Sequence, residues 1–207
     1  MLRNDETELN RYMTQSLAIR AAVEDDCADL ALLADMATRR LTSHLWGLAA
    51  QPGQSAFEVG RRIIHSETGH FSHFHNWRVA EVGGSIAGAL CGCILSTLPT
   101  TTAAGAEVVG PLNALKGVAV GTWYLSAIAL YPEQQRKGLG RAMLADAEAV
   151  ARIARADRIT LMVGSFNTGA RALYQQFGYA EWDRRAFLPF PGSDAEGYWI
   201  LMRKDLR

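Results

Sequence analysis

Alternation of apolar and polar residues predicts several β-strands. Residues 16–21 form a short alternating run, and residues 77–82 and 85–96 lie on either side of Gly83 and Gly84. Two alternating runs joined by a tight glycine turn are typical of a β-hairpin. Further strands are predicted where aromatic, β-branched and other apolar residues are concentrated: 122–131, 158–163, 179–190 and 198–202.

Apolar residues at spacings of three and four predict the helices. The acidic run Glu24–Asp26 suits the N-terminus of the first helix, because a helix begins with partial positive charge. Gly178 ends the last helix. Residues 99–121 show little pattern, and we expect a long loop there. The remaining predicted helices are 56–67, 140–156 and 167–177.

The order of these elements predicts an α/β fold with a single mixed, mostly antiparallel sheet flanked by helices. The helix at 140–156 connects two predicted strands, which implies one parallel crossover. Residues 16–207 are expected to form a single domain. Residues 1–15 are polar and without clear period, and we expect a loosely ordered N-terminal extension.

Composition narrows the class of protein. Hydrophobic residues make up 49% of the chain, which is enough for a full core, and basic and acidic residues balance at 21 each. A neutral chain argues against a nucleic acid or an anionic membrane as partner. Neither a signal-peptide core nor an apolar run of membrane-spanning length is present. Cys27, Cys91 and Cys93 suggest reduced, buried thiols, so we expect a cytoplasmic protein.

The segment 128–141 (IALYPEQQRKGLGR) combines a strand, a proline stop, a glycine loop and a helix start. Such a loop can aim consecutive backbone N–H groups at one point, where the helix N-terminus adds partial positive charge. Arg136, Lys137 and Arg141 add cations that suit phosphate oxygens. The segment lacks the Walker pattern, and Met143 stands where a dinucleotide fingerprint needs its third glycine. Taken alone, the loop is equally compatible with a surface turn that bears solvated charges.

A second motif follows at 167–179 (NTGARALYQQFGY). With both motifs, the chain resembles the GNAT superfamily of N-acetyltransferases. The family pattern [RQ]-x-x-G-x-[GA] is matched by residues 135–140, and N-x-x-[AS]-x-x-[LF]-Y-x-x-x-G-[FY] is matched by residues 167–179. The order of elements is also similar, although before residue 77 the similarity is one of layout only. The resemblance implies a GNAT-like acyl-CoA-binding fold for the single domain at 16–207.

The resemblance also implies a binding site for acetyl-CoA as the acyl-donor co-substrate. The strand before the glycine loop would diverge from its neighbour at a bulge, and the pantetheine arm would pair with backbone groups of Ile128 and Leu130. Asn167 would hold the pantetheine or cap the following helix. The pyrophosphate would be bound by the residues of the loop: Gln135, Arg136, Lys137, Gly138, Gly140 and Arg141.

For catalysis, the resemblance assigns Tyr174 to protonate or stabilise the leaving thiolate. A phenol with a pKa of about 10 suits this role, and the alternative is packing beside Leu173 and Phe177. The acceptor amine would attack the acetyl carbonyl directly in a ternary complex, with no cysteine nucleophile. A base must take its proton, and the catalytic candidate is Glu81. The histidines His70, His73 and His75 are further candidates, and we expect no metal site among them.

The acceptor is expected to be a primary amine of a small molecule or of an amino-acid-like compound. Acetylation of a protein amine, a non-catalytic acyl-CoA sensor and an unrelated nucleotide-binding protein are the alternatives. The regions 44–57 and 184–198 would shape the acceptor pocket, with Trp46, Phe187 and Phe190 as aromatic candidates. Exposed sheet edges would also permit a homodimer.

Overall fold

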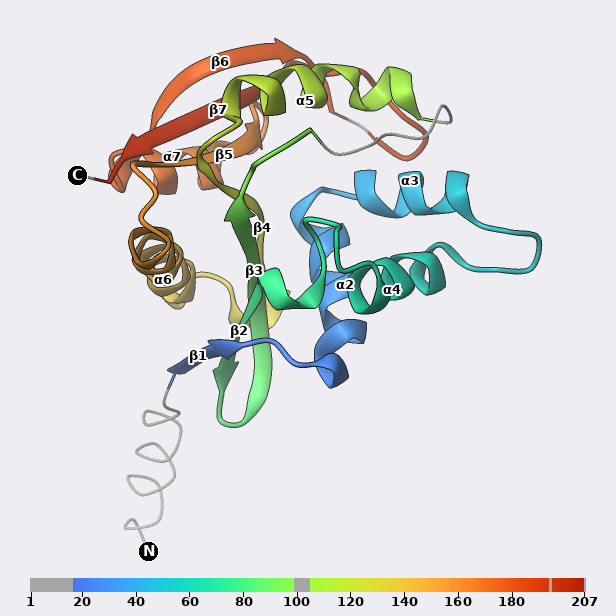
Figure 1. The fold of residues 1–207 in the computed structure, drawn as a ribbon, viewed down its shortest axis with the longest axis horizontal. Helices are drawn as coiled ribbons and strands as arrows, with labels where there is room; N and C mark the ends of the chain where they lie inside the picture. Colours follow the sequence, from blue (N-terminus) through green and yellow to red (C-terminus); the bar gives the residue numbers. More distant parts are fainter. Residues whose placement is uncertain (1–16, 99–104, 194, 207) are drawn as a thin grey trace, which may run out of the picture.

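A single sheet organises the molecule. The computed structural model describes residues 17–98, 105–193 and 195–206, and the extension expected at 1–15 lies outside them. The described strands form one seven-stranded sheet in the order β1-β2-β3-β4-β5-β7-β6 (Figure 1). They are β1 (Leu17–Ala21), β2 (Trp77–Val82), β3 (Ser85–Ile94), β4 (Trp123–Leu130), β5 (Arg158–Gly164), β6 (Ala180–Ala186) and β7 (Tyr198–Asp205).

The pairing directions confirm the predicted fold class. In the described sheet, β4 and β5 are parallel, and every other neighbouring pair is antiparallel. The predicted hairpin of β2 and β3 turns at Gly83 and Gly84, both at positive φ. The structure is therefore an α/β fold with a single mixed, mostly antiparallel sheet.

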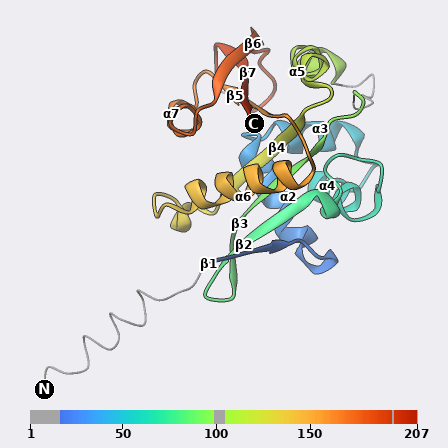
Figure 2. The same cartoon turned by 60° about the vertical axis from the view of Figure 1, so that its left-hand side comes forward.

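Helices flank both faces of the sheet (Figure 2). The α-helices are α2 (Cys27–Ala37), α3 (Leu41–Ala49), α4 (Ala56–Ser66), α5 (Ala106–Ala119), α6 (Leu139–Ile153) and α7 (Thr168–Gln176). Short 3-10 turns occur at η1 (Glu24–Asp26), η2 (Phe74–Asn76) and η3 (Pro132–Gln134). In the described part of the chain, none of the helices combines the length and apolar character needed to cross a membrane.

Each helical layer buries an apolar face against the sheet. Met143 of α6 packs in one buried cluster with Leu125 of β4, and Leu30 of α2 packs in another with Val79 of β2. Leu115 of α5 belongs to a third cluster, beneath β6 and β7. The sheet is thus covered by α6 and α7 on one face and by α2, α3 and α4 on the other.

The loop predicted at 99–121 is wrong over most of its length. The described part contains α5, and residues 99–104 lie outside the described residues. Its buried residues Val109 and Leu115 have helical spacing, but Gly110 and Pro111 lower the local helix propensity. Packing against the sheet therefore stabilises a helix that its sequence only weakly favours.

Helix α3 was not predicted either. It follows α2 after a short turn and buries Leu41 and Trp46. A loop follows it, and Ser55 begins α4 with a capping box to Glu58. The helix at 167–177 ends as expected, with Gly178 at a φ of +86°.

Candidate functional site

Strands β4 and β5 pair at one end and separate at the other. Residues Trp123–Leu125 pair with Ile159–Leu161, and the described strands form no further pairs beyond them. On the other edge of β4, Leu125 and Ala127 have partners in β3, which leaves Ser126 as a bulged residue. The resemblance implied this divergence at a bulge, and the structure contains it.

The divergence leaves a cavity of about 90 Å³ between the two strands. Residues 125–128 of β4 and 161–164 of β5 form its long walls. Asn167 and Tyr174 line it from the side of α7, and Arg39 lines it from the end of α2. The cavity therefore borders both helical layers and runs through the sheet between them.

The glycine loop begins where β4 ends. Gly138 has a φ of +83° and Arg136 a φ of +61°, so both adopt the left-handed region. From Arg136 to Gly140, the described chain shows no hydrogen-bond partner for the backbone N–H groups. Unpaired N–H groups at the start of a helix form an anion-binding concavity, which fits the pyrophosphate of coenzyme A.

Side chains around the loop hold its shape. The Gln135 amide donates to the Leu130 carbonyl at 3.1 Å, and Lys137 Nζ donates to Gln134 Oε1 at 3.2 Å. The Arg141 guanidinium lies 5.2 Å from the centroid of the Phe177 ring. The loop is thereby tied to the end of β4 and to the end of α7.

Asn167 both caps a helix and lines the cavity. Its Oδ1 accepts a hydrogen bond from the Ala170 N–H at 3.3 Å, so it caps the N-terminus of α7. The same residue lines the cavity between β4 and β5. The capping alternative is therefore realised, and the cap places the Asn167 side chain beside the proposed pantetheine path.

Tyr174 is buried at the wall of the cavity. Its side chain is only 7% exposed and packs near Tyr179, with ring centroids 6.0 Å apart. Burial raises the pKa of the Tyr174 phenol to about 12. The hydroxyl therefore carries its proton at neutral pH, as a proton donor must.

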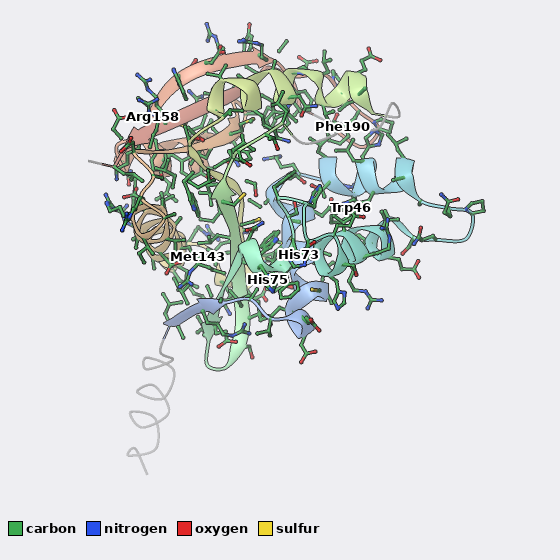
Figure 3. All side chains as sticks on the ribbon, viewed as in Figure 1. Trp46, His73, His75, Met143, Arg158 and Phe190 are labelled. Atoms are coloured by element: carbon green, nitrogen blue, oxygen red, sulfur yellow. The ribbon has the colours of Figure 1, made fainter. Side chains whose placement is uncertain are left out.

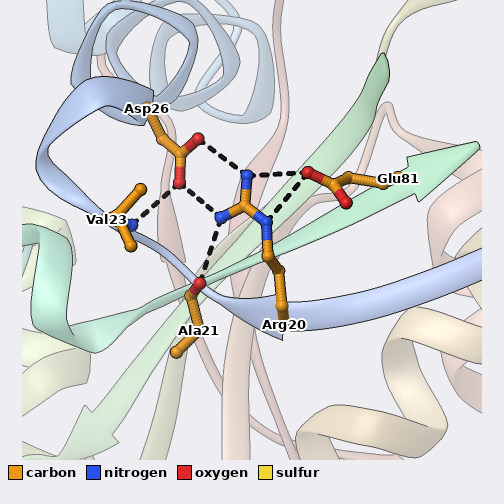
Figure 4. Close-up of polar contacts among 5 residues, drawn as sticks. All are labelled: Arg20, Ala21, Val23, Asp26 and Glu81. Atoms are coloured by element: carbon orange, nitrogen blue, oxygen red, sulfur yellow. Dashed lines mark hydrogen bonds and ion pairs between the residues drawn. The ribbon is translucent and has the colours of Figure 1, made fainter. Parts of the chain in front are cut away.

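The structure does not bring Glu81 to this cavity. Figure 4 shows Glu81 at the β1–β2 edge of the sheet, where it shares Arg20 with Asp26. Arg20 Nε donates to Glu81 at 2.8 Å, and its two terminal nitrogens donate to Asp26 at 2.7 and 2.9 Å. Hydrogen bonds from Arg20 lower the pKa of Asp26. Glu81 is thus part of an ion-pair network that joins β1, β2 and η1.

None of the three histidines is among the described residues that line the cavity. Figure 3 labels two of them, His73 and His75. His73 is the N-cap of the 3-10 turn η2 and His75 lies within that turn, and the His75 N–H donates to His73 Nδ1 at 3.4 Å. Burial lowers the pKa of His70. Within the part of the chain that the structure describes, no three His, Cys, Asp or Glu side chains are grouped to hold a metal ion.

None of the aromatic candidates is among the described residues that line the cavity. Trp46, labelled in Figure 3, packs against Gly60 of α4, whereas Phe187 and Phe190 belong to the buried cluster that contains Leu115 of α5. Phe187 contacts Trp199, with ring centroids 5.3 Å apart, and Trp199 does line the cavity. Trp199 and Arg39 were not predicted, because neither residue belongs to a sequence motif.

A family model, described as the acetyltransferase (GNAT) family, matches residues 39–179. The chain belongs to the GNAT family of acetyltransferases. It is therefore an acetyltransferase of the acetyl-CoA-dependent class, and acetyl-CoA is its co-substrate. A search of curated protein sequences found no match to this GNAT chain.

Solved structures share the fold at low sequence identity. An N-acetyltransferase from Staphylococcus aureus Mu50 has a TM-score of 0.62 at 14% identity, with 90% of this chain and all 100% of that chain covered. The Salmonella typhimurium protein yncA, with its cofactor acetyl-CoA, has a TM-score of 0.58 at 16% identity, with 92% and 94% covered. The ribosomal-protein-S18-alanine N-acetyltransferase from Escherichia coli has a TM-score of 0.58 at 18% identity, with 92% and 94% covered.

Proposed function

We propose that this GNAT protein transfers the acetyl group of acetyl-CoA to a primary amine of a small or amino-acid-like acceptor, by direct attack in a ternary complex. One observation carries the proposal: Tyr174 lines the cavity at the β4 bulge, and the glycine loop that suits pyrophosphate follows the end of the same strand. Strand β4 thus connects the proposed pyrophosphate site to the cavity that holds the proposed proton donor.

The donor would be held mainly by backbone groups. The N–H groups between Arg136 and Gly140 face the pyrophosphate, with Gln135, Lys137 and Arg141 around them. Past Leu125, the edge of β4 that faces β5 is unpaired in the described sheet. The backbone groups of Ile128 and Leu130 can therefore form hydrogen bonds with the pantetheine arm. Asn167 lies on the opposite wall.

Tyr174 would donate its proton to the thiolate that leaves. Its raised pKa keeps the hydroxyl protonated at neutral pH, so that it can donate a hydrogen bond to the sulfur as negative charge develops there. The described residues that line the cavity include neither cysteine nor carboxylate, which favours direct attack over a covalent acyl-enzyme. In the absence of a lining carboxylate, we propose that water carries the proton of the amine to solvent.

Calorimetry with acetyl-CoA tests the donor site. The wild type should bind, and Gly138→Glu should lose binding, because a carboxylate would enter the anion site. Gly84→Glu is the matched control: Gly84 also has a positive φ, of +79°, and, as at Gly138, a Cβ there meets nothing within 4 Å, but it lies in the β2–β3 turn. Absence of wild-type binding, or equal loss in both variants, would contradict the site.

A thiol-release assay over a panel of amines then tests the transfer. Release that depends on both acetyl-CoA and an amine supports the proposed function. Binding of acetyl-CoA without release for any amine would instead favour the acyl-CoA sensor.

A further inference from the structure

The cavity has one charged side chain among the described residues that line it, and this is Arg39. It stands in the turn between α2 and α3, where it is exposed to solvent as well as lining the cavity. Its other neighbours in the lining are apolar or neutral, including Ser126, Met162 and Trp199. A cation in such surroundings attracts an anionic group of the ligand.

The turn fixes where this guanidinium can reach. Arg39 has a φ of +52°, and its N–H donates to the Met36 carbonyl at 3.2 Å. The N–H of Arg40 donates to the Asp35 carbonyl at 3.0 Å, which completes a Schellman motif with arginine where glycine is usual. Arg155 ends α6 with the same motif, at a φ of +56°. The left-handed conformation of Arg39 therefore does not by itself indicate a function. The surroundings of its side chain are the more informative feature.

Those surroundings leave the guanidinium available. The Cζ of Arg39 lies 5.3 Å from the centroid of the Phe166 ring. Stacking on an aromatic face leaves the in-plane N–H groups of arginine free to donate. Among the described residues, no carboxylate forms an ion pair with Arg39. The guanidinium thus contacts an aromatic ring and is not neutralised by a carboxylate of the described residues.

We propose that Arg39 binds a carboxylate of the acceptor, so that the substrate is an amino acid whose amine reaches the β4 bulge. The planar fork of arginine matches a carboxylate with two parallel hydrogen bonds. Because Arg39 and the bulged residue Ser126 line the same small cavity, we expect few bonds between the amine and the carboxylate of the acceptor. This inference rests on the proposed function and adds the class of acceptor.

Matched acceptors test the inference. The pairs are L-phenylalanine with 2-phenylethylamine, and L-methionine with 3-(methylthio)propylamine, assayed by thiol release with acetyl-CoA. The wild type should favour the amino acid of at least one pair by kcat/KM. Arg39→Gln should lower kcat/KM for that amino acid by about 10- to 100-fold, the range expected for a charge-assisted hydrogen bond, and affect its paired amine at least tenfold less.

Arg39→Gly and Arg155→Gly separate binding from folding. Glycine suits both left-handed positions, so both variants should keep or raise the midpoint of thermal unfolding. Only Arg39→Gly should lose the preference for the carboxylate. Equal kcat/KM within every pair, or equal loss for both members in Arg39→Gln, would overturn the inference alone. No release from any amine would overturn the proposed function and the inference with it.

Discussion

At the scale of single residues, Tyr174 is the group whose environment most directly suits chemistry. It is almost fully buried, yet its ring lines the cavity next to the diverging strands. Removing solvent disfavours the phenolate, so burial raises the pKa and keeps the hydroxyl protonated. The same burial that packs the ring therefore keeps the hydroxyl protonated, and it also makes the phenol a weaker acid that suits hydrogen-bond donation to the leaving thiolate.

Tyr174→Phe should lower kcat by about 100-fold, the lower end of general acid catalysis, because a thiolate is already a fair leaving group. The wild-type rate should rise with pH as the amine loses its proton. It should show no falling limb below about pH 10, since the donor pKa is about 12. Stopped-flow or steady-state pH profiles measure both effects. An unchanged kcat in Tyr174→Phe would leave Tyr174 a packing residue only.

Lys116 is a second residue with an unusual environment. It lies on α5 with its Nζ 5.0 Å from the Phe71 ring centroid, and burial lowers its pKa from 10.5 to about 8. Between these values the unfolded chain binds more protons than the folded chain, so its titration raises the free energy of unfolding as the pH rises. Below pH 8 the folded state bears the cost of a buried charge.

Lys116→Met should therefore raise the free energy of unfolding at pH 7, by roughly 1–3 kcal/mol, and remove the rise between about pH 8 and 10. Urea denaturation of wild type and variant across that range provides the measurement. A wild-type curve that runs parallel to that of the variant would show that Lys116 keeps its ordinary pKa.

At the scale of elements, the packing of α3 on α4 depends on a missing side chain. Gly60 of α4 faces the ring of Trp46, and a Cβ at Gly60 would collide with that ring. Gly47, in α3 itself, has nothing within 4 Å of a Cβ and is exposed. A methyl group should therefore be tolerated at Gly47 but not at Gly60.

Gly60→Ala should lower the free energy of unfolding by about 1–3 kcal/mol through overpacking. Gly47→Ala should raise it by up to about 1 kcal/mol, because alanine favours the helix. Chemical denaturation of the two variants measures the difference. Similar effects of both substitutions would contradict the close approach of Trp46 to α4.

Some elements are determined by residues close in sequence, whereas others depend on tertiary packing. The β2–β3 hairpin and the end of α7 at Gly178 were predicted because glycines at fixed positions determine them locally. Helix α5 was missed because its stability comes from the sheet on which it packs, against the preference of Gly110 and Pro111. Arg39 was not predicted because its place at the cavity depends on the tertiary fold and not on a local motif.

At the scale of the whole molecule, the proposed donor site should respond to acetyl-CoA as one unit. Hydrogen exchange should slow at the backbone N–H groups of residues 127–130 and 136–140, where the ligand replaces water. Exchange in β1 and β6, at the two outer edges of the sheet, should change little. Uniform protection, or protection confined to the edges, would argue against binding between β4 and β5.

The gap between β4 and β5 also bears on how this protein avoids aggregation. Unpaired strand edges normally invite other chains to add to a sheet. Here the unpaired stretch lies within the sheet, between the layers of α2 and α7, so it is less accessible to a second protein chain than an outer edge. The outer edges are protected differently, since β1 is short and β6 carries the charges of Asp183 and Arg184. The unpaired backbone groups of β4 can therefore bind a thin, flexible ligand such as a pantetheine arm and yet be less accessible to other copies of the chain.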